Sequence, residues 1–451
     1  MTEQPKPTTN KKPSRTRRWA KIVALVIGAL VLLAFLACSL LMLWGSRGIR
    51  REIEAVKALH EPSNWDELLL TDGRGHVATS SVAFAPADVC AIYAKALVRS
   101  KGWDKELSRE FYNALAKGTP SPEDVQRLGE ALSHYQEALA LFREAARDDA
   151  FVNLPEDSPE FVTQRQLDLL EVEREAARLL RSQAFHAAAQ GRADEAADTC
   201  IVLLRYARAF PGDNLMGGYV HFAVIGAACR AIEETQTMAP SSAEKLDAIR
   251  QALKTFVDDI PMPRIFCGER VCGSYLFQSG WVKEPRFLLW PNHAAYLELM
   301  REAVSASRMP FPESLWQMEK VRSRYDQSIG PSHLFSVFAQ HLMYNSTLLL
   351  ALEEGARSQA RIRATLVSLA IRRAKLDGMA LPASLHELVP KYLSAIPTDP
   401  FTGEPLKYRV DETGCKIYSV GPGGVDKGGA AKAMIGSGGN PGQDIGVRLP
   451  R

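Results

Sequence analysis

Apolar and polar positions change their pattern along the chain. A continuous apolar run, IVALVIGALVLLAFLACSLLMLW, extends from Ile22 to Trp44 without a charged residue. From about residue 50 to 350, apolar residues recur at spacings of three and four, as on amphipathic helices. After Pro382 they alternate, which is typical of strands. We therefore predict a mainly α protein with a disordered basic tail (1–21), a transmembrane helix (22–44), a helical exported body (50–350) and a small C-terminal α+β module (355–451).

The apolar run is long enough to cross a membrane, because its 23 residues would rise about 34 Å as a helix. Seven basic residues and one acid precede it, which favours a cytoplasmic N-terminus and an exported body. A cleaved signal peptide usually has a shorter apolar region. A lipoprotein signal would use Cys38, but Phe35 fits poorly three residues before that cysteine. We expect an uncleaved, single-pass anchor in the inner (cytoplasmic) membrane.

The charge of the body differs from that of the whole chain. The formal charge is +3, and the first 21 residues alone contribute +6, so the remainder carries about −3. A basic face for nucleic acid is therefore not indicated. We expect the membrane and envelope proteins as partners, and no nucleic acid.

Two stretches of the body carry more specific predictions. Residues 219–229, YVHFAVIGAAC, are apolar on all sides but too short to span a bilayer, so they should form the most buried helix, with His221 as a core residue. Residues 184–208 resemble one tetratricopeptide-type hairpin that turns at Gly191. A single repeat cannot build a solenoid, so an ordinary helical hairpin is the favoured interpretation.

The sequence CGERVC holds the candidate chemistry of the body. Glu269 and Arg270 could be a buried catalytic carboxylate with its guanidinium, or a structural ion pair. No nucleophile, metal set or phosphate loop accompanies them, which favours the structural interpretation. Cys267 and Cys272 could form a short-loop disulfide or remain thiols. The other cysteines do not show the spacing of a zinc site.

The C-terminal segment carries an ordered series of motifs. Apolar residues from Ile362 to Ala374 line one helix face, and Asp377-Gly378 ends that helix. The motifs LPASLHELVP, DPFTGEPLKY, YSVGPGG and DIG follow, with strands predicted over 406–410 and 416–420. Over about ninety residues this order resembles the soluble part of the major pseudopilins of type II secretion. The whole layout resembles membrane-anchored proteins of planctomycete-type bacteria.

The resemblance implies a calcium site in the Gly-rich loop after the strand pair, with oxygen ligands that suit a hard cation. Asp426 and Asp444 are the candidate ligands, although Gly423 stands where the family usually has an aspartate. The apolar helix also lacks the leader and the glutamate of a pseudopilin, and some three hundred residues separate it from the motifs. The chain therefore resembles a membrane protein that carries a pseudopilin-like module, rather than a pilus subunit.

Two functions follow from these observations. The first is a membrane-anchored interaction or scaffold protein of the cell envelope, linked to secretion or pilus-like machinery. The alternative is an envelope enzyme of hydrolase type, with its site in the helical body near Glu269 and Arg270. A cleft that joins Glu269 to a histidine or serine would favour the enzyme, and a buried salt bridge would favour the scaffold.

Overall fold

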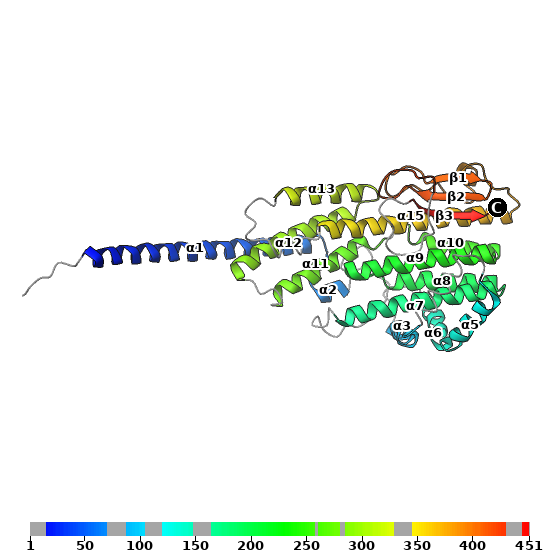
Figure 1. Ribbon diagram of the computed structural model, residues 1–451, viewed down its shortest axis with the longest axis horizontal. Helices are drawn as coiled ribbons and strands as arrows, with labels where there is room; N and C mark the ends of the chain where they lie inside the picture. The colour runs from blue at the N-terminus through cyan, green and yellow to red at the C-terminus, as the bar shows by residue number, and fades with distance from the viewer. Residues whose placement is uncertain are drawn as a thin grey trace, which may run out of the picture.

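The structure is a computed structural model that describes residues 15–69, 87–103, 120–147, 164–257, 260–279, 285–328, 345–429 and 444–450. These residues are mainly helical, with a small antiparallel sheet near the C-terminus, which confirms the predicted class in outline. The molecule is elongated: α1 projects from one end, and the sheet and the C-terminus lie at the other (Figure 1).

The helices run in the following order: α1 (Arg15–Ala58), α2 (Trp65–Leu69), α3 (Ala87–Ser100), α5 (Pro122–Ser133), α6 (Gln136–Ala145), α7 (Gln164–Ala189), α8 (Ala193–Ala209), α9 (Leu215–Met238), α10 (Ala243–Lys254), α11 (Met262–Gln278), α12 (Arg286–Ser307), α13 (Glu313–Ser328), α15 (Asn345–Leu376) and the 3₁₀ turn η3 (Leu385–Leu388). The strands are β1 (Lys407–Asp411), β2 (Gly414–Ser419) and β3 (Ile445–Pro450).

The apolar run lies within α1, which is longer than predicted at both ends. The helix begins at Arg15, inside the predicted disordered tail, and continues past Trp44 to Ala58. Residues 1–14 lie outside the described part of the chain. The part of α1 from Leu25 to Ala58 contains an apolar window long enough to be a membrane anchor or a signal sequence. Helix α9 also passes that test of length and composition, but 78% of its apolar window is buried, as expected for a core helix.

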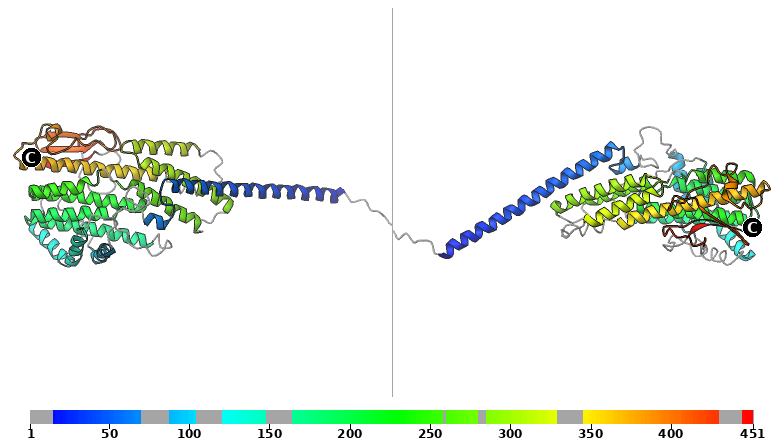
Figure 2. Two further views of the ribbon diagram at one scale, coloured as in Figure 1. Left: turned by 180° about the vertical axis from the view of Figure 1, so that it is seen from behind. Right: turned by 90° about the horizontal axis from the view of Figure 1, so that it is seen from above.

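The second half of α1 packs against α12 through two small residues. A Cβ atom on Gly45 would lie 2.6 Å from the backbone nitrogen of Pro291, and one on Gly48 would lie 2.8 Å from the Cβ of Ala294. Glycines three residues apart share a helix face, so the two backbones approach closely along this face. In Figure 2, the body lies beside only the C-terminal part of α1.

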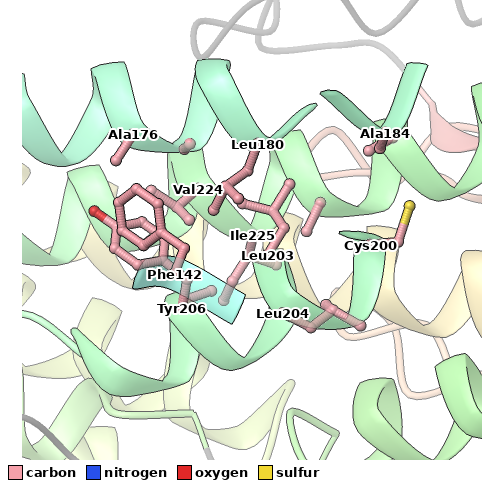
Figure 3. Packing of buried hydrophobic residues seen from close by; sticks show 14 of the residues in the cluster. Phe142, Ala176, Leu180, Ala184, Cys200, Leu203, Leu204, Tyr206, Val224 and Ile225 are labelled. Carbon is pink, nitrogen blue, oxygen red and sulfur yellow. The ribbon is translucent and has the colours of Figure 1, made fainter. Parts of the chain in front are cut away.

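The main core lies between α6, α7, α8 and α9. Phe142, Leu180, Leu203, Tyr206 and Ile225 from these four helices meet there and are buried (Figure 3). The predicted hairpin is present: α7 ends at Ala189, Gly191 takes a φ of +75°, and α8 starts at Ala193. A glycine is favoured at that positive φ.

The predicted buried stretch 219–229 lies in α9, and His221 is a core residue. Its Nδ1 lies 3.0 Å from the backbone oxygen of Phe210. Burial lowers the pKa of His221 to about 4, so the ring is neutral at pH 7.

The C-terminal sheet packs on α15, a helix that it shares with the body. Ile362, Leu366 and Leu369 of α15 belong to the main core, whereas Val367 and Ile371 belong to the core under the sheet. The predicted boundary between 350 and 355 thus falls inside α15. The helix ends at Leu376, just before Gly378 with its φ of +83°, as predicted.

The strand order is β1-β2-β3, with both pairs antiparallel. The two predicted strands match β1 and β2. Three of their four ends lie within one residue of the prediction, and β2 begins two residues earlier than predicted. β3 was not predicted as a strand. One helix against a small antiparallel sheet is the arrangement expected for the C-terminal segment.

Candidate functional site

Buried charges gather where α1 meets the body. Nη1 of Arg270 donates to Oε2 of Glu61 at 2.6 Å, and Nη2 of Arg308 donates to Oε1 at 2.8 Å. The side chains of Arg270 and Glu61 are only 2% and 3% exposed. Arg270 also donates to the backbone oxygen of Pro62 at 3.0 Å. One carboxylate therefore joins the chain just after α1 to both α11 and α12.

A second buried carboxylate lies on α1 itself. Glu52 accepts from Nε of Arg301 on α12 at 2.7 Å and from Arg51 at 2.9 Å. Together with the contacts of Gly45 and Gly48, this ion pair fixes how α1 lies along α12. We call the residues Glu52, Glu61, Arg270, Arg301 and Arg308 the α1 joint.

The Gly-Glu-Arg element of α11 holds the start of α9 as well. A Cβ on Gly268 would lie 1.5 Å from the backbone oxygen of Asp213, so only glycine permits this approach. The carboxylate of Glu269 accepts from the N–H of Leu215, the first residue of α9, at 3.2 Å. An acid at a helix N-terminus satisfies an unpaired N–H and interacts favourably with the helix dipole. Arg264, one turn earlier, donates to Asp213 at 2.6 Å.

Glu269 and Arg270 therefore act on different neighbours. Successive side chains on a helix point about 100° apart, so these two reach toward α9 and toward Glu61 respectively. Burial raises the pKa of Glu269, and the hydrogen bond from Leu215 opposes that shift. Both groups hold structural contacts, in line with the ion-pair interpretation for Arg270, whose partner is Glu61 instead of Glu269.

Cys267 and Cys272 are not joined by a disulfide. They lie five residues apart on α11, which separates them by about 7.5 Å along the helix axis. The Cα atoms of a disulfide are usually less than about 7 Å apart. Burial raises the pKa of the Cys267 thiol to about 12, so this sulfur is unreactive at neutral pH.

A small cavity lies between the end of α1, α11 and α12. Arg270, Ser274 and His293 line it, together with apolar side chains that include Val56 and Leu297. The ring of His293 is buried and stacks on Phe277, with centroids 4.8 Å apart. Its Nε2 has no hydrogen-bond partner within the part of the chain that the structure describes. Desolvation lowers the pKa of His293 to about 4. The imidazole is therefore a neutral core group at pH 7.

His293 should make stability depend on pH. Its pKa is about 4 when folded and about 6.5 when unfolded, so the unfolded state binds more protons between these values. Stability should thus fall as the pH drops from about 6.5 to 4. The pKa values of Glu233 and Glu269 are raised, so these acids act in the opposite sense. His293→Gln should flatten the acid loss by up to about 3 kcal/mol, measured by denaturant unfolding at each pH.

The matched control is His134→Gln, because His134 is exposed. It should leave the pH dependence of the parent protein unchanged. Equal slopes for the parent and His293→Gln would contradict a buried, neutral His293.

The predicted calcium ligands hold the Gly-rich loop through hydrogen bonds. Asp444 accepts from the N–H groups of Lys427 at 3.1 Å and Gly429 at 2.8 Å. Asp426 accepts from the guanidinium of Arg409 at 2.7 Å and the hydroxyl of Tyr418 at 2.9 Å. A calcium ion needs oxygen ligands, whereas donors face these carboxylates. Within the described residues, no group of three or more acidic, His or Cys side chains is placed to hold a metal. Residues 430–443 of the loop lie outside the described part.

Asp444 should therefore stabilise the sheet without a metal. Asp444→Ala should cost about 1–3 kcal/mol, because two partly buried N–H groups lose the buried carboxylate that accepts from them. The same loss is expected with calcium and with a chelator, measured by thermal unfolding. Glu412→Ala, in an exposed turn, is the control. If calcium raises the melting temperature of the parent protein and not that of Asp444→Ala, Asp444 is a metal ligand and this prediction is wrong.

Several residues of the α1 joint could not be found by sequence reasoning. Glu52 and Glu61 lie far along the chain from the arginines that they bind. The sequence does contain a signal at the arginines: Arg264 and Arg270 stand among apolar residues of one helix, and a buried arginine needs a partner.

In the C-terminal segment, buried Asp399 accepts hydrogen bonds from Ser419 at 2.8 Å and from the N–H of Val420 at 2.9 Å. These bonds join the DPFTG turn to the end of β2.

Comparison with protein-family models, curated proteins and solved structures gives no match for this chain.

Proposed function

We propose that this protein is a single-pass anchor of the inner membrane with a cytoplasmic N-terminus and an exported body. In this proposal it is a non-enzymatic interaction protein that presents a pseudopilin-like sheet to envelope proteins of secretion or pilus-like machinery. One observation carries the proposal: α1 continues without a break into the body, and the sheet lies at the far end of the molecule (Figure 1).

The arrangement of α15 supports the presentation of the sheet. This 32-residue helix is part of the main core in its middle and supports the sheet near its C-terminal end. The sheet is therefore packed against a helix of the body and is not attached only by a flexible linker. The helix and the strand pair follow one another in the order of the motifs that carry the resemblance to pseudopilins, which supports the proposal.

The contacts of Glu269 and Arg270 favour this function over the envelope hydrolase. Glu269 receives the first N–H of α9, and Arg270 is paired with buried Glu61. The cavity beside Arg270 does contain Ser274 and His293, but buried His293 has a pKa of about 4, too low for a general base near neutral pH.

Protease accessibility tests the orientation. Protease added to intact spheroplasts should digest the body and leave a short membrane-protected N-terminal fragment. A body that survives until lysis would reverse the orientation, and a shortened soluble protein would show that α1 is a cleaved signal.

Site-specific photo-crosslinking tests the partner. β1 is an edge strand, and Arg409 on it pairs with Asp426, next to Val425, which is 62% exposed. A photoreactive residue at position 425 should form an adduct with a secretion or pilus-like component in intact cells. The control is position 98 on α3, where Val98 is 71% exposed. Adducts of the same kind at both positions, or none at 425, would contradict the proposal.

A further inference from the structure

We infer that the first turn of α12 dips into the membrane beside α1, so that the body touches the lipid interface at a second place. This inference rests on the proposed membrane anchoring by α1. The surface consists of Arg286, Phe287, Leu288 and Trp290, and its partner is the headgroup and upper acyl region of the bilayer.

The first step is the register of the two helices. Gly45 meets Pro291, and Gly48 meets Ala294. Farther along, Glu52 binds Arg301, and Glu61 binds Arg308. The partners advance together along both stretches, so α12 runs parallel to α1.

The second step follows from that register. Residues that precede Pro291 on α12 must lie beside residues that precede Gly45 on α1. The stretch 286–290 therefore stands next to 40–44, which is the last turn of the apolar run of α1. If that run crosses the bilayer, the start of α12 is at the depth where the run leaves it.

The third step is the chemistry of this turn. Phe287, Leu288 and Trp290 are partly exposed, and Arg286 is exposed, whereas Leu289 packs against the body core. In water the exposed parts of Phe287, Leu288 and Trp290 would gain no stabilisation from burial. At a bilayer surface it fits, because Trp is enriched at the interface and an arginine can extend its head group toward water. Exposed Trp44 on α1 lies at the same level and fits the same zone.

The fourth step concerns orientation. A body joined to the membrane by one helix could tilt or rotate about that helix. A second lipid contact, held at the correct depth by the α1 joint, restricts the tilt. The body then keeps its long axis, and the distal sheet, in one direction relative to the membrane.

Fluorescence quenching of the full chain in phosphatidylcholine vesicles tests this inference. In a background with Cys38, Cys90 and Cys272 changed to Ala, environment-sensitive labels are placed one at a time by Leu288→Cys, Phe287→Cys, Leu30→Cys and Trp316→Cys. The four remaining cysteines are buried. Lipids with a quencher near the headgroup should quench the labels at 287 and 288 to within about twofold of each other, as for a shallow interfacial helix. The label at 316, on an exposed part of α13, should not be quenched.

The label at Leu30, in the middle of the apolar run, distinguishes failure of the α12 membrane contact from failure of the α1 anchor. Quenching at 30 by deeply placed quenchers, without quenching at 287 or 288, would overturn the dip of α12 and leave the anchor standing. A label at 30 that no lipid quenches would overturn the anchoring, and the dip with it.

Discussion

Replacing Glu61 by methionine is expected to cost about 3–5 kcal/mol of unfolding free energy, the range for breaking a buried ion pair. The reason is the environment of Arg270, whose side chain is 2% exposed and would keep its charge without a carboxylate. Arg308 is more exposed and can turn toward water. Denaturant unfolding of the purified protein in detergent measures the loss.

The reverse change should cost less. In Arg270→Met, the carboxylate of Glu61 keeps Arg308 as its partner at 2.8 Å. The double variant, with methionine at both positions, should recover much of the loss of Glu61→Met, because no uncompensated buried arginine remains. Additive losses in the double variant would contradict a coupled pair.

An exposed ion pair provides the control. Arg192 and Glu195 also form a salt bridge, but their side chains are 42% and 38% exposed. Arg192→Met should change the stability by less than about 1 kcal/mol. A loss as large as that of Glu61→Met would show that burial is not what gives the α1 joint its strength.

Among glycine-to-alanine substitutions in the body, Gly268→Ala should cause the largest loss of stability. The new Cβ would lie 1.5 Å from the backbone oxygen of Asp213, so α11 and the start of α9 must move apart. That movement also disturbs the Arg264–Asp213 ion pair and the bond from Leu215 to Glu269. We expect a loss of about 3 kcal/mol or more, the upper end for overpacking, measured by the same unfolding assay.

Gly226→Ala is the matched control. Gly226 is buried in α9, and the nearest atom to an added Cβ is 3.5 Å away, an ordinary contact. Because alanine is the better helix former by about 1 kcal/mol, this variant should be as stable as the parent or more stable. If both alanine variants have the same unfolding free energy, the close approach at Gly268 does not contribute to stability, and the prediction is wrong.

The sequence predicts those parts of the fold that local periodicity determines. The helical body, the end of α15 at Gly378 and the strands β1 and β2 all follow from spacing and turn residues. The strand β3 does not, because its short sequence IGVRLP becomes a strand only by pairing with β2.

The extension of α1 illustrates a second limit. Gly45 and Gly48 follow the apolar run and look like residues that end a helix, since glycine is a poor helix former. Their role is visible only once α12, some 240 residues later, lies against them. The ion pairs of Glu52 and Glu61 have the same character, because a buried charge predicts that a partner exists and not which one.

The central claim of a membrane helix joined rigidly to the body can be tested by one distance measurement. Spin labels at Leu40 on α1 and Trp316 on α13, both exposed, are read by pulsed electron paramagnetic resonance in lipid nanodiscs. We predict one narrow distance distribution, and a broader one when Gly45→Leu forces α1 away from α12. A broad distribution in the parent protein, unchanged by Gly45→Leu, would show a flexibly attached anchor and contradict the account.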